Sequence, residues 1–284
     1  MTILAVSTWH ERPDLLLAQI EGYNLSFDGD VVHMVHINSD FHDVFFADAE
    51  KQNIDFKKVG NLYFAESPRS TRYAVIAHAY MHSVNEAMRI GLKFDYIYFH
   101  TSSDIMFKRG AAKYIREHDV GLYKAVAWNI LGGHSSDRFR IDVKNPTKWL
   151  ANIEKDKKAI FFYRTMKQEK IFGKRHEGMF FRKDIFFEAI FPLVSHYNID
   201  EIENQIHVYP IEEFLFTQCL EMICKRYELK RGRNLIHSVK TLSCEDLNEA
   251  YQNPGVFGIK RPSKILDSPE RVLANEMLLR KVTT

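Results

Sequence analysis

The sequence contains few cysteines, few prolines and no large excess of one charge. Its 284 residues include three cysteines, and their odd number and spacing fit neither a disulfide framework nor a CxxC zinc knuckle. We therefore expect a protein of a reducing compartment. The 8 prolines and 13 glycines are too few for a collagen-like chain, and the overall composition excludes disorder and coiled coil.

Charge and hydropathy exclude two further classes of protein. Lys and Arg number 39 against 37 Asp and Glu, and a net charge of +2 argues against duplex nucleic acid as a partner. No apolar run approaches the roughly 18 residues of a membrane span. The first residues lack the basic and apolar segments of a signal peptide. We expect a cytoplasmic protein and leave open a peripheral contact with the inner face of the membrane.

The chain has the composition and periodicity of an α/β protein. Hydrophobic residues make up 45% and charged residues 27%, and the length allows one large domain or two small ones. Apolar strands alternate with helical segments at the spacing of βα units. The strands that this pattern predicts are residues 3–7, 31–37, 61–65, 95–101 and 123–129.

Turn and capping residues predict where the helices begin and end. Pro13 opens the first helix, which Gly22 should end, and Ser67 and Pro68 open the longest helix, which should run to about residue 90. Residues 135–175 are polar and weakly patterned, so we expect loops there with one short helix. The remaining predicted elements are strands at 177–182 and 206–209 and helices at 184–190 and 210–220.

Acidic residues lie where a sheet or a helix would present them to a ligand. Asp104 follows the strand 95–101, and ligands of open α/β sheets bind beyond the carboxyl ends of strands; a turn or capping role is the alternative. Glu212 and Glu213 lie in the first turn of a helix, where they either suit the helix dipole or act in catalysis.

Two further features suit a sugar or a phosphate. Glu177 and Gly178 precede an aromatic strand, although Glu177 could equally be a surface residue. Residues 225–240 hold six Lys or Arg and one Glu, which indicates either a solvated face or a phosphate site.

No histidine pattern predicts a metal centre. His10, His100 and His134 have no partners at a zinc-type spacing, so we expect packing, turn or hydrogen-bonding roles for them. His78 and His82 are four residues apart on the predicted long helix and could hold a metal in principle, although a solvated helix face is the interpretation that we favour.

The transfer of a sugar from a nucleotide diphosphate needs the parts found so far. A carboxylate must take the proton of the acceptor hydroxyl as that hydroxyl attacks the anomeric carbon. Positive charge must stabilise the departing diphosphate. That charge comes either from a metal held by acidic residues or from Lys and Arg side chains.

Four short segments, taken in their order, carry a resemblance to a known family. They are Ser-Ser-Asp at 102–104, Glu-Gly-Met-Phe-Phe at 177–181, Pro-Ile-Glu-Glu-Phe-Leu-Phe-Thr at 210–217 and Phe-Gly-Ile-Lys-Arg at 257–261. Over most of its length the chain resembles glycosyltransferases of the core-2/I-branching type, which are β-1,6-N-acetylglucosaminyltransferase-like enzymes. This group has the GT-A fold, and its bacterial members serve surface polysaccharides.

The resemblance implies a fold and a division of the chain. We expect a single GT-A-like, Rossmann-related α/β domain with a mixed, mostly parallel central sheet flanked by helices. Residues 1–130 would form the nucleotide-sugar-binding half. Residues 131–284 would form the acceptor-binding and catalytic half, with a basic C-terminal segment at 225–284.

The resemblance also implies a mechanism. In that family the glutamate two residues after the proline of the third segment is the catalytic base, which places this role on Glu212, with Glu213 as the neighbouring candidate. The family lacks a true DxD metal motif, and here Ser102 leaves Asp104 without an acidic partner. We expect inverting transfer that requires neither a divalent metal nor a cofactor.

Substrate contacts are expected from the same resemblance and from position at strand ends. The family neutralises the diphosphate with basic side chains near the C-terminus, and the matching positions are Lys260 and Arg261, with Arg233 or Lys240 as a second source of charge. The other expected donor-binding residues are Thr8, His10, Asn38, Arg72, Ser103 and Asp104, and the expected acceptor-binding residues are Glu177 and Gly178.

The sequence thus predicts a glycosyltransferase that uses a nucleotide sugar, which we expect to be UDP-linked, and a saccharide or glycolipid acceptor in glycan or surface polysaccharide synthesis. Two alternatives stay open. One is a metal-dependent glycosyltransferase or nucleotidyltransferase that uses Asp104. The other is a non-catalytic module that binds a carbohydrate or a nucleotide.

Overall fold

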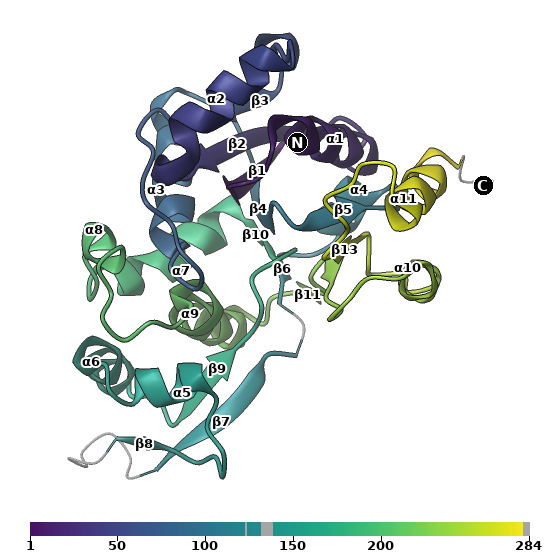
Figure 1. Cartoon of the computed structure of the whole chain (residues 1–284). Coiled ribbons are helices and arrows are strands. Elements are labelled where there is room, and N and C mark those ends of the chain that lie inside the picture. Colours follow the sequence, from purple (N-terminus) through teal and green to yellow (C-terminus); the bar gives the residue numbers. More distant parts are fainter. Residues whose placement is uncertain (123, 132–138, 281–284) are drawn as a thin grey trace.

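A central sheet of seven strands organises the computed structural model, which describes residues 1–122, 124–131 and 139–280 (Figure 1). The order along this sheet is β11-β6-β10-β4-β1-β2-β3. Its strands are β1 (Ile3–Trp9), β2 (Val31–Ile37), β3 (Leu62–Phe64), β4 (Tyr96–Thr101), β6 (Val120–Gly121), β10 (Phe180–Arg182) and β11 (Arg231–Gly232).

Most neighbouring strands of the sheet are parallel. β1 pairs in parallel with both β2 and β4, and β2 pairs in parallel with β3, which gives the strand order of a Rossmann-type half. β10 runs antiparallel to both β4 and β6. The predicted α/β class, with a mixed and mostly parallel central sheet flanked by helices, is confirmed.

Helices cover both faces of this sheet, and those that contribute to its two main cores include α1 (Pro13–Ser26), α3 (Ala77–Arg89), α4 (Ala111–Arg116), α7 (Lys183–Val194) and α9 (Ile211–Tyr227). Side chains of a strand alternate between its two faces. Leu4 and Val6 of β1 therefore join the core under α3, α7 and α9. Ile3 and Ala5 join the opposite core with α1 and α4.

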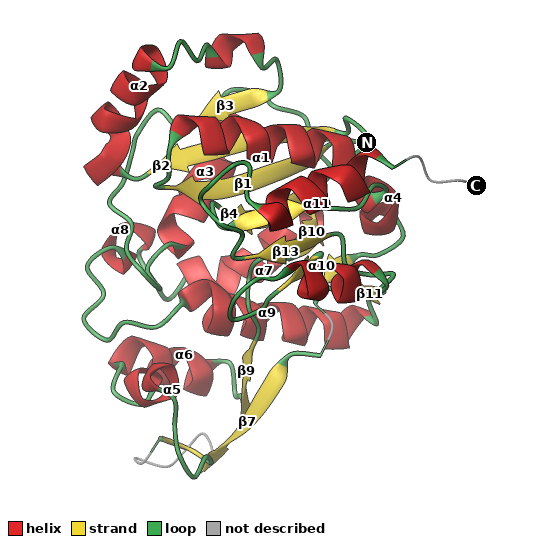
Figure 2. Ribbon diagram, turned by 45° about the vertical axis from the view of Figure 1, so that its right-hand side comes forward, coloured by secondary structure: helices red, strands yellow, loops and turns green. Residues whose placement is uncertain are grey.

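Smaller elements surround the central sheet. A second sheet combines β5, β12 and β13, and a third combines β7, β8 and β9, which extends away from the central sheet beside α5 and α6 (Figures 1 and 2). These elements and the remaining helices are α2 (His42–Lys51), β5 (Asp104–Met106), β7 (Val126–Leu131), β8 (Arg140–Ile141), α5 (Lys148–Ile153), α6 (Lys157–Thr165), β9 (Lys170–Gly173), α8 (Ile199–Ile202), β12 (Ile236–His237), α10 (Cys244–Tyr251), β13 (Gly258–Lys260) and α11 (Pro269–Leu279).

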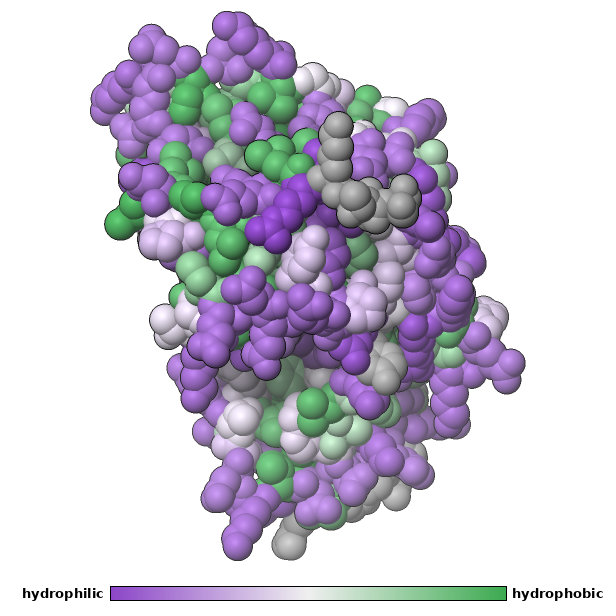
Figure 3. Space-filling model, turned by 90° about the vertical axis from the view of Figure 1, so that its right-hand side faces the viewer, coloured by the Kyte–Doolittle hydropathy of each residue, from purple (hydrophilic) through white to green (hydrophobic). Residues whose placement is uncertain are grey.

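The surface is largely polar on the side that carries α10 and α11. Hydrophilic residues cover most of this face, and the apolar residues on it form separate groups (Figure 3). Within the described residues, no helix combines the length and the apolar character that crossing a lipid bilayer requires.

The prediction that the long helix opens at Ser67 is wrong, since α3 begins at Ala77. Residues 67–76 form a loop, in which Ala74 has a φ of 63°, a left-handed conformation that an α-helix does not contain. Contacts of this loop with the ends of the sheet strands, described below, override the local helix signal. The other end of the helix lies where the sequence predicts it, with Gly91 just beyond at a φ of 80°.

Other predicted boundaries also need correction. α1 continues past Gly22 to Ser26, and a Cβ at Gly22 would lie 3.9 Å from Cδ2 of Leu278, because α11 packs on α1 there. The region predicted as loops with one helix contains α5, α6, β8 and β9, although residues 135–138 lie outside the described part. Residues 206–209 are not a strand. The strand predicted from residue 123, itself outside the described part, begins at 126.

Candidate active site

A cavity of about 620 Å³ opens at the carboxyl ends of β1, β2 and β4. These strands are parallel, so their ends meet at one edge of the sheet. Thr8 lies near the end of β1, Asn38 directly follows β2, and Ser102 and Ser103 directly follow β4; all four line the cavity. The edge that should carry the donor site therefore carries a cavity of a size suited to a small molecule.

The loop 67–76 forms one wall of the cavity and is fastened to the end of β2. The side-chain amide of Asn38 donates to the carbonyl of Thr71 at 2.9 Å, and its Oδ1 accepts from the backbone N–H of Thr71 at 3.1 Å. Nε2 of His36 accepts from the backbone N–H of Arg69 at 2.8 Å. Burial lowers the pKa of His36 to about 3, so this imidazole is neutral and able to accept.

The same loop brings a cation and an aromatic ring to the cavity. Arg72 lines it from the loop rather than from the predicted helix, and its guanidinium donates to the carbonyl of Gln205 at 3.0 Å. Tyr73 packs against Trp149 of α5 with 5.6 Å between ring centroids. Phe41 also lines the cavity. The sequence gives no signal for these three aromatic residues, because they come from separate segments with no shared motif.

The first turn of α9 supplies two carboxylates. Glu212 is 2% exposed, and burial raises its pKa to about 7, although the nearby His176 partly opposes this rise. Neither carboxylate oxygen of Glu212 has a hydrogen-bond partner among the described residues. Nδ1 of His176 lies 3.6 Å from Oε1 of Glu212 and 3.3 Å from Oε1 of Glu213. Three titratable side chains therefore meet in one corner of the cavity.

An ion pair between Lys260 and Glu177 lines the cavity on the side of β13. The ammonium of Lys260 contacts Oε1 of Glu177, and both side chains are largely buried. Burial lowers the pKa of Lys260, while the charge of Asp104, opposite it in the β5–β13 pairing, raises it. The next residue, Arg261, has a φ of 70° and donates its backbone N–H to the carbonyl of Ser103 at 2.7 Å.

Two residues expected to bind substrate lie behind the cavity wall. Asp104 is 1% exposed, and its Oδ2 accepts from the backbone N–H of Thr101 at 2.8 Å, so it stabilises the turn between β4 and β5 and does not line the cavity. Gly178 has a φ of 77°, and a Cβ there would lie 2.4 Å from the backbone nitrogen of Ile236. Glycine at this position thus permits a close approach of two chain segments.

Two expected cations also lie away from the cavity lining. The backbone N–H of Arg233 donates to the hydroxyl of Tyr114 at 2.8 Å. Lys240 is exposed, and its carbonyl accepts from the guanidinium of Arg261 at 2.9 Å. The expected site residues that do line the cavity are Thr8, His10, Asn38, Arg72, Ser103, Glu177, Glu212, Glu213, Lys260 and Arg261.

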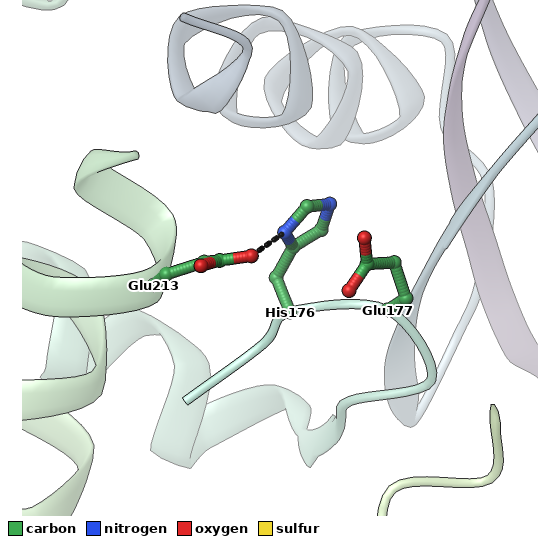
Figure 4. A group of neighbouring side chains, drawn as sticks. All are labelled: His176, Glu177 and Glu213. Carbon is green, nitrogen blue, oxygen red and sulfur yellow. Dashed lines mark hydrogen bonds and ion pairs between the residues drawn. The ribbon is translucent and has the colours of Figure 1, made fainter. Parts of the chain in front are cut away.

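His176 is the central residue of the site that the sequence did not single out. Its imidazole stands between Glu213 and Glu177 (Figure 4), and potential ligand atoms of these three residues lie within 4.8 Å of one another. One imidazole and two carboxylates can hold a divalent cation. The ammonium of Lys260 already balances the negative charge of one of these carboxylates, that of Glu177. The signal for His176 was its place directly before the Glu-Gly segment.

The histidine pair of the long helix is not a solvated face. His78 is fully buried and its Nε2 lies 2.9 Å from the carbonyl of Ser70. Nε2 of His82 lies 3.4 Å from the carboxylate of Glu86, which is also buried. Three further histidines were expected to have packing, turn or hydrogen-bonding roles. Of these, His10 lines the cavity and His100 is buried between aromatic rings. His134 lies outside the described residues.

Comparisons with known proteins give no family. No family model matches the chain, and no curated protein does. Among solved structures, a nucleoside-diphosphate-sugar pyrophosphorylase from Vibrio cholerae matches with a TM-score of 0.40 and 12% identity, over 81% of this chain and 90% of the other. An inositol-1-phosphate CTP transferase from T. maritima matches with a TM-score of 0.36 and 10% identity, over 97% and 96%.

A third solved structure, 4-diphosphocytidyl-2C-methyl-D-erythritol synthase from Anaerococcus prevotii, matches with a TM-score of 0.35 and 11% identity, over 80% of this chain and 98% of the other. Similarity at these values is too low to transfer an activity to this chain. The resemblance to core-2/I-branching glycosyltransferases therefore stays a prediction.

Proposed function

We propose that the protein is a glycosyltransferase that moves a sugar from a nucleotide sugar to a hydroxyl of a saccharide. The observation that carries this proposal is the state of Glu212, a buried carboxylate at the cavity with no hydrogen-bond partner among the described residues and a pKa raised to about 7. A general base is most effective when its pKa lies near the working pH. Glu212 meets this requirement, and it is one of the residues that line the cavity.

The reaction that this base supports is a single displacement. The acceptor hydroxyl gives its proton to Glu212 while its oxygen forms a bond to the anomeric carbon of the donor. The bond between that carbon and the diphosphate oxygen breaks on the opposite face, and the nucleoside diphosphate leaves with the electron pair. The configuration at the anomeric carbon is therefore inverted.

Cationic side chains take the developing negative charge of the diphosphate in this proposal. Lys260, Arg261 and Arg72 all line the cavity that Glu212 lines. Preorganised cations stabilise a leaving group without a metal ion. The aromatic residues Tyr73 and Trp149 offer ring faces to the base or to the sugar of the donor. We expect a UDP-linked donor, and an acceptor that belongs to a surface polysaccharide or a glycolipid on the cytoplasmic side of the membrane.

The proposal is tested by turnover and by binding, measured separately. Thermal shifts with UDP, GDP and CMP identify the nucleotide, since a ligand at 100 times its Kd adds about 2.7 kcal/mol of stability. Release of that nucleotide from its sugar conjugates then reports transfer or hydrolysis. Glu212→Gln should lower turnover about a hundredfold or more and leave nucleotide affinity unchanged. Glu249→Gln, an exposed carboxylate of α10, is the matched control. Wild-type turnover in Glu212→Gln would remove the base from the mechanism.

A second candidate function is metal-dependent transfer of a glycosyl or nucleotidyl group. The observation that favours it is the group formed by His176, Glu177 and Glu213. Asp104, the residue first considered for a metal, does not line the cavity. Activity that needs Mn²⁺ or Mg²⁺ and stops with a chelator would favour this candidate over the cationic mechanism. Nucleotide binding without any turnover would instead indicate a non-catalytic module.

A further inference from the structure

A second cavity, of about 420 Å³, shares a wall with the candidate active site. Arg175, Glu177 and Glu213 line both cavities. The second cavity lies at the base of the β7–β9 arm rather than at the carboxyl ends of the parallel strands, where nucleotides bind in open α/β sheets. A molecule bound there would therefore lie next to the cavity of the candidate active site, the donor cavity, without occupying it.

An aromatic surface forms one side of the second cavity. Trp128 of β7 packs on Phe214 of α9 with 6.0 Å between the ring centroids and 36° between the ring planes. Gly173 of β9 lets the indole approach the backbone, because a Cβ there would lie 2.8 Å from Cζ3 of Trp128. The indole is thus held at the cavity wall between two neighbours. A fixed aromatic ring is a suitable platform for the apolar face of a sugar.

Positive charge dominates the polar part of the second cavity. Lys124, Lys174 and Arg175 line it. Its carboxylates already have cationic or imidazole neighbours, since Glu177 contacts Lys260 and Glu213 lies 3.3 Å from His176. The lining residues of this cavity therefore favour an anion.

The surroundings of Lys174 point the same way. The guanidinium of Arg233 is near enough to act on the charge of its ammonium. The late cation Arg233, which lies outside the donor cavity lining, thus adds to the positive field beside the second cavity.

We propose that this second cavity is the acceptor subsite and that the acceptor is an anionic saccharide, whose ring lies on Trp128 and whose phosphate or carboxylate meets Lys124, Lys174 and Arg175. The role of this sugar as the acceptor rests on the proposed glycosyl transfer, whereas the binding of an anionic sugar in this cavity does not depend on it. Glu213 and Glu177 border both cavities, so an acceptor placed here would lie against residues that also line the donor cavity.

Calorimetric titration of the full chain with glucose 6-phosphate, glucuronate and glucose tests the inference. At least one of the two anionic sugars should bind about tenfold more tightly than glucose, which equals about 1.4 kcal/mol. Comparison of the phosphate with the carboxylate then identifies the anionic group. Equal affinity for all three sugars would overturn the inference.

Variants locate the binding. Lys124→Gln combined with Lys174→Gln should lose the preference for the anionic sugar, and Trp128→Phe should weaken the binding of all three sugars. Arg261→Gln, which changes the donor cavity alone, should leave the preference intact, and so should Lys93→Gln on the exposed surface. A preference lost in Arg261→Gln and kept in the double variant would place the anion in the donor cavity and overturn the inference.

Failure of the proposed function would look different. Release of nucleotide diphosphate in the absence of any acceptor sugar measures the donor site alone, and the double lysine variant should retain it. If the double variant loses the preference for an anionic sugar but the protein turns over no nucleotide sugar, the binding site is supported and the transferase function is refuted. If the protein turns over the donor but the two lysine substitutions leave sugar binding unchanged, the transferase function is supported and the anionic-sugar site is refuted.

Discussion

Nδ1 of His176 lies 3.6 Å from Oε1 of Glu212, and the two side chains are only 6% and 3% exposed. His176 partly opposes the rise that burial causes in the pKa of Glu212. The same Nδ1 lies 3.3 Å from Glu213. His176 thus positions the pair of glutamates from which the proposed base comes.

The pKa of Glu212 makes the stability of the protein depend on pH. Because burial raises this pKa from 4.5 to about 7, the folded protein binds more protons than the unfolded chain between these two values. The contribution of Glu212 therefore favours folding at pH 4.5, declines as the pH rises to about 7 and stays low above it. A shift of this size corresponds to about 3 kcal/mol. Glu212→Gln should remove the decline, so the variant should gain stability relative to wild type at pH 8.

Urea denaturation at a series of pH values between 5 and 8 measures this effect. Glu249→Gln on the exposed surface of α10 should keep the wild-type slope. Under the proposed mechanism, kcat/KM should rise with pH through about 7 as Glu212 loses its proton. Parallel stability curves for Glu212→Gln and wild type would show that the carboxyl of Glu212 titrates alike in the folded and unfolded chain.

Removal of Lys260 should destabilise the protein through Glu177. The Lys260 and Glu177 side chains are 16% and 8% exposed, and Lys260→Met leaves the carboxylate buried without its partner. Breaking a buried pair in this way costs about 3–5 kcal/mol. The double variant Lys260→Met with Glu177→Gln should recover much of that loss, as a double-mutant cycle in urea would show.

The matched control for this pair is the contact between Lys51 and Asp48 of α2. These two residues lie 3.1 Å apart, and their side chains are 76% and 41% exposed. Lys51→Met should cost less than about 1 kcal/mol, as is usual for exposed pairs. If Lys260→Met cost no more than Lys51→Met, the charge of Glu177 would have access to water or to another cation.

The sequence predicts well what depends on local periodicity and on the geometry of parallel strands. The strand at 31–37 was located to the residue, and Thr8 and Asn38 reach one cavity because the ends of adjacent parallel strands meet. Lys260, near the end of the chain, is placed at the cavity by the pairing of β13 with β5. This is a contact between segments distant in the sequence, which periodicity does not encode. Only the motif resemblance indicated it.

The misplaced features have physical causes of the same kind. The helix start at Ser67 was predicted from capping residues, whereas hydrogen bonds to Asn38 and His36 hold this segment as a loop. Asp104 was considered for its place after a strand, and only the structure shows that its carboxylate turns inward to Thr101. Burial and side-chain direction depend on the packed fold, which a single sequence does not display.

The wall formed by loop 67–76 should depend on the amide of Asn38. This side chain both donates to and accepts from the backbone of Thr71. Asn38→Ala removes both hydrogen bonds and should destabilise the protein by about 1–3 kcal/mol. Asn38→Asp keeps an acceptor and loses the donor, so it should lie between Ala and wild type. Hydrogen exchange of the Thr71 amide measures the loop directly, and unchanged protection in Asn38→Ala would show that other contacts hold it.

A last prediction concerns Gly178, where an alanine would introduce two different causes of strain. Gly178→Ala combines an unfavourable φ of 77° with a Cβ placed 2.4 Å from the backbone of Ile236. Gly110→Ala is the matched control, because its φ is 87° and nothing lies within 4 Å of the added Cβ. Left-handed backbone strain alone costs about 1–2 kcal/mol. Gly178→Ala should cost clearly more, since backbone atoms cannot move aside as a side chain can. Thermal unfolding of both variants decides the matter, and equal losses would mean that the Glu177–Gly178 turn can shift away from β12 without breaking the site.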